Sequence, residues 1–293
     1  MIQKNPGEKA FDFFNILFML LVILITLYPF YYVICASLSQ SSLLLTHRGL
    51  LLKPLKPTIG AYELTFSYPL VRSGYGNTLF VLAFGLPINL LMTLLCAYIM
   101  AAKRVLYKKF IYTFIMFTMF FSGGLIPGFL NIRSLGLYNS LWALILPGAI
   151  SVYNTIIVKT AMDGIPESLK EAAHIDGAND ITILFQVVVP LIIPTLAVIT
   201  LYYGVSHWNS WFSAVIYLKD NVKLPIQAVM RAILIENDTI LNASNVAEDG
   251  TINDFAETIK YSLIVVGTLP ILVLYPFLQK YFVKGVMIGA VKG

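Results

Sequence analysis

The chain has 293 residues, of which 58% are hydrophobic and only 12% are charged, and its mean hydropathy is +0.79. A soluble domain of this length could not bury so much apolar surface, so the composition predicts an all-α polytopic membrane protein. The formal net charge is +5. The expected surroundings are membrane lipid, and no nucleic-acid partner is predicted.

Six stretches of the chain are long and apolar enough to cross the hydrocarbon core, which takes roughly 20 helical residues. Inside a bilayer each segment must satisfy its own backbone polar groups, so each stretch is expected to be a helix. The predicted transmembrane helices are 13–36, 77–100, 110–129, 138–161, 191–208 and 261–282. The first is too long for a signal peptide and lacks a convincing cleavage site, so we interpret it as a retained helix.

The loops between the spans divide into two sides. An even number of spans puts the N-terminus, 1–12, and the tail, 283–293, on one side, together with a short basic loop that contains Lys103, Arg104, Lys108 and Lys109. The positive-inside rule makes this side cytoplasmic. The sequence therefore predicts a multi-pass membrane protein with both termini in the cytoplasm.

The spans carry almost no ionisable side chains. Residues 13–46, 76–102, 110–132 and 134–158 contain no Asp, Glu, Lys or Arg, whereas ion-driven carriers need such groups at membrane depth. The chain also lacks the glycine-rich loop that would hold a nucleotide phosphate. Energy for any transport is therefore expected from a separate ATPase.

The segment 163–190 is a polar, helix-patterned insertion on the predicted cytoplasmic side. Pro166 suits the first position of a helix, and Gly177 suits the position after its end. Leu169, Ala172, Ala173 and Asp176 then share one face. Asn179 or Asp180 could cap a second helix that runs toward Pro190.

Two segments are predicted to lie outside the cytoplasm, 37–76 and 209–260. The second is expected to contain an amphipathic helix near residues 225–235, followed by a polar stretch, 236–257. That stretch could be a solvated linker or an arm that docks an external protein. The sequence supports no metal site and no disulfide, because the two cysteines lie in separate spans.

Aromatic and polar side chains in and next to two spans are candidates for a solute pathway, because sugar sites combine rings with hydrogen-bonding groups. They are candidates by location only, and packing explains them equally well. His174 and His207 are each interpreted as structural. The pathway candidates are Tyr153, Asn154, Tyr202, Tyr203 and Asn209.

The insertion resembles a known motif. Glu171-Ala172-Ala173, three residues, Gly177, nine residues and then Val187-x-Val189-Pro190 resemble the EAA loop of permease subunits of ATP-binding-cassette (ABC) importers. Three further segments resemble the carbohydrate-uptake permeases of the MalG-like type: Asn77-Thr78, Trp208-Asn209-Ser210-Trp211 and 275–285. The terminal segment 286–293 resembles a branch of these permeases that serves oligosaccharides such as alginate. The resemblance implies a bacterial cytoplasmic (inner) membrane.

This resemblance implies the transmembrane domain of a type I ABC importer, in which the EAA helix docks into a cleft on the ATPase. It implies a second, homologous permease, two ATPase subunits and an extracytoplasmic solute-binding protein. No cofactor is expected in this chain, because ATP and Mg belong to the ATPase subunits, and no catalytic residue is expected. The ATPase-coupling residues implied by the motif are Glu171, Ala172, Ala173, Asp176, Gly177 and Ala178.

Three alternatives to a carbohydrate permease remain open. One is an ABC permease for a solute other than sugar, such as an amino acid or a phosphonate, that works as a homodimer. Another is an ion-coupled secondary transporter or a membrane-embedded enzyme, either of which would need ionisable groups that the spans do not provide. The third is a purely structural assembly subunit.

Overall fold

The structure is a computed structural model that describes residues 5–103, 105–235 and 257–273. The described residues are helical, with connecting turns, and contain no strand. They fall into two compact units. The predictions for the polar stretch, the end of the sixth span and the tail concern 236–256 and 274–293, which lie outside the described residues.

The first unit comprises residues 1–68 and 232–269. It contains α1 (Pro6–Ser37), α2 (Ser41–Thr46), α3 (Gly60–Ser67) and a final helix whose described part is 257–273. Thr65 of α3 and Ser262 of the final helix share a buried hydrogen bond of 2.6 Å. Tyr32 of α1 contacts Tyr261 edge to face.

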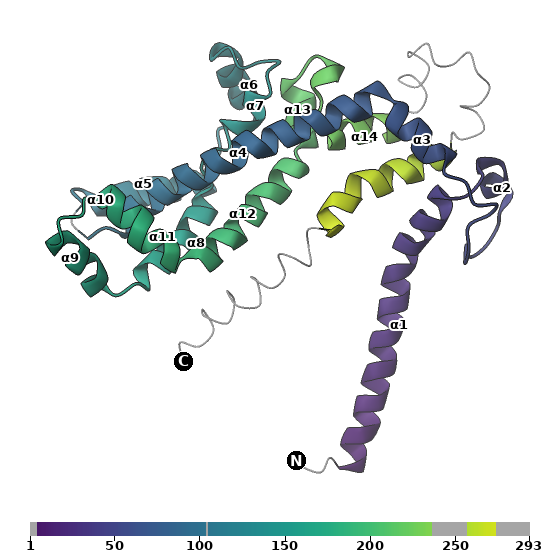
Figure 1. Ribbon diagram of the computed structural model, residues 1–293, viewed down its shortest axis with the longest axis horizontal. Coiled ribbons are helices and arrows are strands. Elements are labelled where there is room, and N and C mark those ends of the chain that lie inside the picture. The colour runs from purple at the N-terminus through teal and green to yellow at the C-terminus, as the bar shows by residue number, and fades with distance from the viewer. Residues whose placement is uncertain (1–4, 104, 236–256, 274–293) are drawn as a thin grey trace. The chain divides into compact units, whose positions relative to one another are not determined.

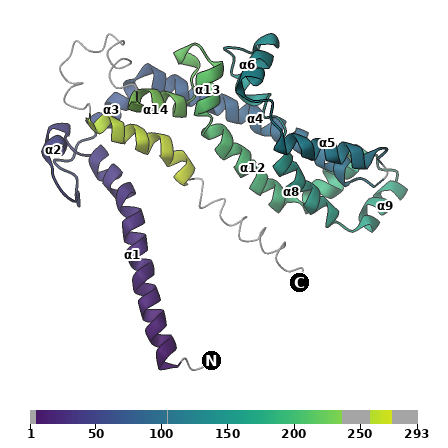
Figure 2. The same cartoon turned by 180° about the vertical axis from the view of Figure 1, so that it is seen from behind.

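The second unit comprises residues 69–231 and 270–293, and α4 (Pro69–Ala101) runs through it as its longest helix. α8 (Val152–Asp163) and α12 (Ile193–Trp208) pack along α4 (Figure 1). Figure 2 shows the same part of the chain from behind, with α9 (Glu167–Ile175) near one end of α4 and α13 (Trp211–Tyr217) nearer the other. α4 therefore connects two regions of the unit.

Helix α4 begins earlier than the sequence predicted, at Pro69 instead of Asn77. Gly74 lies in this additional first part of α4, where the backbone of Ile226 approaches: a Cβ on Gly74 would come within 3.2 Å of the Ile226 Cα. Ile226 begins α14 (Ile226–Ile235), which confirms the helix expected near 225–235. The glycine permits close packing of α14 on α4.

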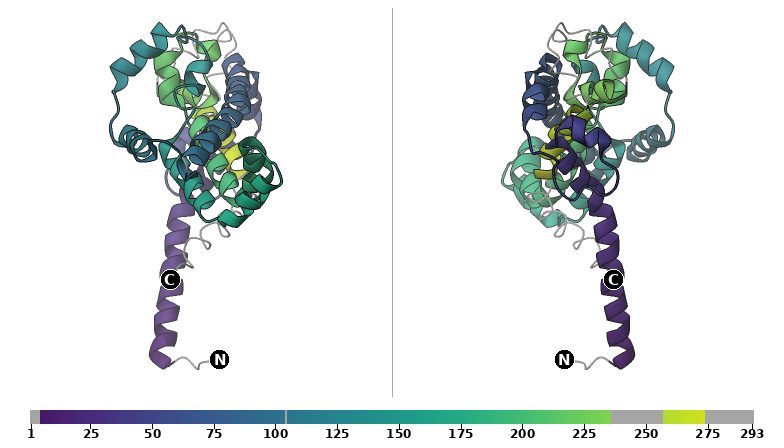
Figure 3. Two further views of the ribbon diagram at one scale, coloured as in Figure 1. Left: turned by 90° about the vertical axis from the view of Figure 1, so that its left-hand side faces the viewer. Right: turned by 90° about the vertical axis from the view of Figure 1, so that its right-hand side faces the viewer.

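Two of the predicted spans are not continuous helices. The stretch 110–129 divides into α5 (Lys108–Phe120) and α6 (Leu125–Ser134), with a bend of 112° at Gly123-Gly124. Gly124 has φ +88, a conformation that glycine adopts without steric cost. Figure 3 shows the two helices joined by a non-helical segment.

The expectation of one helix over 138–161 is also wrong. The short α7 (Trp142–Ile145) ends before Pro147-Gly148, and α8 begins only at Val152. Proline removes a backbone donor and glycine favours a break, so this pair interrupts the helix.

The fifth predicted span, 191–208, corresponds to α12 and is preceded by a bent segment. α10 (Asp180–Thr182), a π-helical turn η1 (Ile183–Val188) and α11 (Val189–Leu191) lead into α12 with a bend of 88°. Pro190 and Pro194 flank that bend, and each deprives the preceding turn of a hydrogen bond.

By length and composition, two helices among the described residues could cross a membrane, α1 and α4. The two bent pairs, α5 with α6 and α10–α11 with α12, would raise that number to four if each is one span. The six spans and their boundaries stay a prediction.

Candidate functional site

Helix α9 carries the predicted coupling motif and has a well-defined end. It begins at Glu167, with Pro166 just outside it, and its last residue is Ile175. Gly177 has φ +83 and donates its N–H to the His174 carbonyl at 3.1 Å, while Ala178 N–H reaches the Ala173 carbonyl at 2.9 Å. These two bonds form a Schellman motif. The left-handed glycine expected after the helix is confirmed.

The second predicted helix start is also confirmed. Asn179 caps α10, since its side-chain oxygen accepts from the Thr182 N–H at 2.8 Å. The chain thus turns within three residues between two capped helices, α9 and α10.

The six predicted coupling residues divide between an outer and an inner surface. Glu171, Ala172 and Asp176 are exposed, as is Gly177. Ala173 and Ala178 are partly buried instead, and both pack against a cluster of buried hydrophobic residues. The outward surface gains two large apolar side chains, because Leu169 is exposed and Ile175 is 86% exposed.

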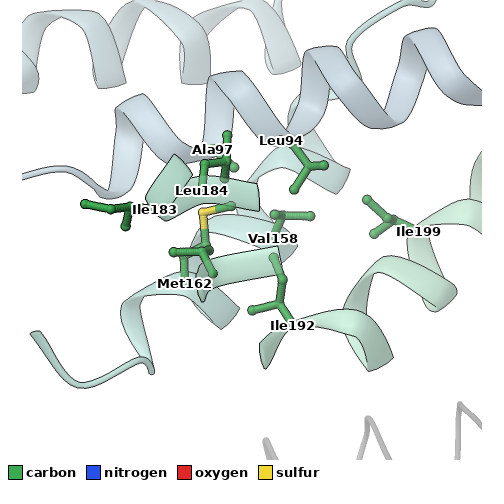
Figure 4. Packing of buried hydrophobic residues seen from close by; sticks show 9 residues of the cluster. Leu94, Ala97, Val158, Met162, Ile183, Leu184, Ile192 and Ile199 are labelled. Atoms are coloured by element: carbon green, nitrogen blue, oxygen red, sulfur yellow. The ribbon is translucent and has the colours of Figure 1, made fainter. Parts of the chain in front are cut away.

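The cluster beneath α9 consists of buried apolar side chains, and it joins four segments of the chain. Figure 4 shows its members converging from α4, α8, the η1 turn and α12. The cluster consists of Leu94, Ala97, Val158, Met162, Ile183, Leu184, Val188, Ile192 and Ile199.

Two polar contacts add to this packing at the same end of α4. The hydroxyl of Tyr98 donates to Asp180 Oδ1 at 3.2 Å, and Lys103 forms an ion pair with Glu167 at 3.4 Å. Both partners belong to the capped turn or to the first turn of α9. The end of α4 and the coupling segment are therefore held together by apolar and polar contacts.

A cavity of about 830 Å³ lies beside α12, between the α7–α8 interruption and α13. All five predicted pathway residues line it: Tyr153 and Asn154 from the start of α8, Tyr202 and Tyr203 from α12, and Asn209 just after α12. The other polar lining residues are Ser151, Ser206, His207, Ser210, Ser213 and Tyr217.

The cavity wall is uncharged over the part of the chain that the structure describes. The lining residues include no Asp, Glu, Lys or Arg. Hydroxyl, amide and ring groups form the wall together with apolar side chains such as Leu144, Ile150 and Phe212. This chemistry fits a solute that presents many hydroxyl groups.

One wall of the cavity is the interruption between α7 and α8, and it is held by hydrogen bonds. The Ser151 side chain caps α8 by accepting from the Asn154 N–H at 3.3 Å. The Tyr203 hydroxyl accepts from the Ser151 N–H at 2.9 Å and shares a further bond of 2.7 Å with the Thr93 hydroxyl.

A second group of bonds reaches the same wall from α4, through residues that the sequence reasoning missed. Asn89 is fully buried and donates to the carbonyls of Gly148, at 2.7 Å, and Ala149, at 3.2 Å. Its Oδ1 lies 2.6 Å from His207 Nε2. An amide side chain inside an apolar span needs hydrogen-bond partners, so the sequence could have identified Asn89 by this requirement.

Asn139 is the centre of a hydrogen-bond network that holds residues 219–223 in the second unit. Its side-chain oxygen accepts from the N–H groups of Lys219 and Asp220, each at 3.1 Å, and its amide donates to Asp220 Oδ2 at 2.8 Å. Lys223 contacts both Asp220 and the Asn139 carbonyl. The bonds from Asn139 and Lys223 hold the pKa of Asp220 below its usual value.

The family motif Asn77-Thr78 has a structural role in the same region. The Asn77 amide donates to the carbonyls of Val222, at 2.7 Å, and Leu224, at 3.1 Å. The Thr78 hydroxyl accepts the Ile226 N–H at 2.9 Å, the first donor of α14. The motif therefore fastens the segment before α14 to α4.

The chain combines apolar helices with a capped surface helix that packs on an apolar cluster, and it contains an uncharged polar cavity. This architecture is that of a transporter subunit. The comparisons agree. The family model of binding-protein-dependent transport system inner membrane components matches residues 78–288, and the chain belongs to this family.

Relatives match over nearly the whole chain. The polygalacturonan/rhamnogalacturonan transport system permease protein YtcP of Bacillus subtilis (strain 168) is 39% identical, over 98% of this chain and 99% of the relative. Protein LplC of the same organism is 38% identical, over 100% and 98%.

A solved structure gives the same fold. One chain of a bacterial ABC transporter involved in the import of the acidic polysaccharide alginate is 30% identical, with a TM-score of 0.88 over 96% of this chain and all of that one. The resemblance to ABC importer permeases and the all-α membrane fold are thus confirmed. The chain is a membrane-bound transport subunit and not an enzyme.

Proposed function

We propose that this chain forms, with a second and homologous permease, the membrane pathway of an ATP-driven importer for oligosaccharides. Two ATPase subunits and an extracytoplasmic solute-binding protein complete the assembly. The observation that carries the proposal is the uncharged cavity of about 830 Å³, lined by tyrosine, serine and asparagine side chains. Such groups bind sugar hydroxyls and rings.

The relatives support a carbohydrate, since one is named for polygalacturonan and rhamnogalacturonan and a solved neighbour for alginate. Each of those names includes an acidic sugar. The described part of this cavity has no cationic side chain, so carboxylates of an acidic substrate would need their positive partners on another subunit.

The proposed orientation places both termini and the segment 163–190 in the cytoplasm, and 37–76 and 209–260 outside. Glu171, Ala172, Asp176 and Gly177 then face the ATPase together with Leu169 and Ile175, while Ala173 and Ala178 fasten the helix to its own core. Closure of the two ATPase subunits would move α9 and, through the cluster, α4, α8 and α12.

The test is uptake by proteoliposomes that contain the complete complex. A binding protein loaded with tetragalacturonate is compared with one loaded with a neutral tetrasaccharide such as cellotetraose. We expect ATP-dependent uptake of at least one sugar. Uptake of an amino acid but of neither sugar would favour a non-sugar permease, and uptake along an ion gradient without ATP would contradict the proposal.

A further inference from the structure

The buried contact between α4 and α12 lies directly behind the cavity wall. Asn89 and His207 meet there, and Gly85 of α4 makes room for the ring, since a Cβ on Gly85 would lie 2.7 Å from His207 Nε2 and 3.1 Å from its Cε1. We call Gly85, Asn89 and His207 the α4–α12 lock.

The direction of the bonds in the lock follows from Asn89. Its amide nitrogen donates to the carbonyls of Gly148 and Ala149, so its Oδ1 is the acceptor that faces His207. Nε2 of His207 must then donate and carries the ring proton. One asparagine thereby joins the histidine of α12 to the non-helical segment 146–151.

That segment has a specific need for these bonds. Helix interruption leaves carbonyls without partners, and at membrane depth non-helical backbone is tolerated only where protein groups or a cavity satisfy it. Asn89 satisfies two of them, and Tyr203 binds the next donor, Ser151 N–H. Pro147, Gly148, Ile150 and Ser151 of the same segment line the cavity.

We propose that Asn89 and His207 are positioning residues for the solute: through the lock they fix the segment 146–151 and thereby set the shape of the cavity and the length of sugar that it admits. This inference rests on the proposed function for the identity of the solute. The effect of the lock on the cavity wall does not depend on that identity.

The chain offers a matched pair of variants. Gly85→Ala drives a methyl group into the His207 ring, whereas Gly76→Ala adds the same group to the same helix where nothing lies within 4 Å. His207→Phe keeps the size of the ring but removes the donor to Asn89. His207→Gln is the conservative variant, since its amide can donate again.

The first measurement requires no substrate. In the assembled complex, with Cys35 and Cys96 replaced by alanine, an Ile150→Cys reporter in the wall is labelled with N-ethylmaleimide. We expect Gly85→Ala and His207→Phe to raise the labelling rate at least fivefold, and Gly76→Ala and His207→Gln to change it less than twofold. Equal rates in all four variants would overturn the inference.

The second measurement separates positioning from folding. Uptake of digalacturonate and tetragalacturonate, and of cellobiose and cellotetraose, is compared per assembled complex. We expect the ratio of tetrasaccharide uptake to disaccharide uptake to shift at least threefold in His207→Phe and to return to the wild-type value in His207→Gln. A loss of uptake at an unchanged ratio, in proportion to lost complex, would show a merely structural contact.

The two proposals fail in different ways. If the wild-type complex imports none of these sugars, the carbohydrate assignment is lost, and the labelling rates still decide whether the lock orders the wall. If sugars are imported and the length ratio stays constant while labelling changes, the positioning role is lost and the carbohydrate assignment stands.

Discussion

Two adjoining stretches of α4 are held by different kinds of interaction. Near the C-terminal end of the helix, Leu94 and Ala97 pack in a cluster of buried apolar side chains beneath α9. Just before them in the chain, Asn89 and Thr93 take part in directional hydrogen bonds around a polar cavity. Close packing transmits displacement because it has no slack, whereas hydrogen bonds fix orientation. We therefore expect the apolar stretch to receive motion from α9 and the polar stretch to shape the solute pathway.

The largest loss of stability is expected from removing a side chain of the apolar cluster beneath α9. Met162→Ala removes a fully buried side chain from its centre and should cost about 2–5 kcal/mol of stability through lost burial and a cavity. Thermal unfolding of the detergent-solubilised complex measures the loss. Leu106→Ala is the control, because that side chain is 76% exposed and should leave unfolding unchanged. Equal loss in both variants would contradict the burial of Met162 in this cluster.

A smaller loss of stability is expected from breaking the polar contacts beside the cavity. Tyr203→Phe removes a hydroxyl that binds both Thr93 and the Ser151 N–H, and a buried donor left without a partner costs about 1–3 kcal/mol. The same unfolding assay tests it. Tyr153→Phe serves as the control, because Tyr153 is 55% exposed and lines the cavity; it should lower sugar uptake without lowering stability.

The charge of the solute can be read from a pair of cavity variants. Ser206 is exposed and lines the cavity. Ser206→Lys and Ser206→Glu should lower uptake of a neutral oligosaccharide about equally, since each adds a larger side chain to the wall and an uncharged solute does not distinguish the two signs of charge. For an acidic oligosaccharide, Ser206→Glu should lower the initial uptake rate at least tenfold more than Ser206→Lys. Initial uptake rates give the ratio, and a tenfold asymmetry with a neutral sugar would contradict this view of the cavity.

A local effect of about 1 kcal/mol is expected at the end of α9. Gly177→Ala forces a side chain into the left-handed conformation, so the Schellman turn should loosen. Hydrogen exchange at Ala178 N–H, which is bonded to Ala173, should then quicken. Gly7→Ala, where a Cβ meets nothing within 4 Å, controls for the substitution itself. Unchanged exchange at Ala178 would show that the turn does not need glycine.

The smallest effect concerns acid. Because Asn139 and Lys223 lower the pKa of Asp220 in the folded chain, its contribution to stability is present above the usual carboxyl pKa and is lost as the pH falls through the lowered value. Asp220→Asn should therefore flatten the acid side of the thermal stability profile slightly. A steeper acid side in the variant would reverse the assigned sign.

The sequence predicted the coupling end well because its signals are local. Gly177 and Asn179 act within their own turn, and their capping roles follow from residue type and spacing. The five pathway candidates also all line one cavity. Hydropathy alone could not show the breaks at Gly123-Gly124 and Pro147-Gly148, because apolar residues continue on both sides of each break.

The α4–α12 lock was missed for a different physical reason. A search of the spans for ionisable groups passes over Asn89, which is neutral, and Gly85, whose role depends on a ring 122 positions further along the chain, at His207. Long-range contacts of this kind depend on how helices pack. The sequence can flag a buried amide, but only the structure identifies its partners.

The most direct test of the account is the ATPase rate of the complete complex with and without its sugar-loaded binding protein, in the wild type and in Glu171→Ala. Glu171 is exposed on α9, so the variant chain should fold normally. The account predicts that stimulation by the loaded binding protein falls at least tenfold while the basal rate and the yield of complex stay within twofold. Full stimulation in Glu171→Ala, and in Gly177→Pro as well, would contradict coupling through α9.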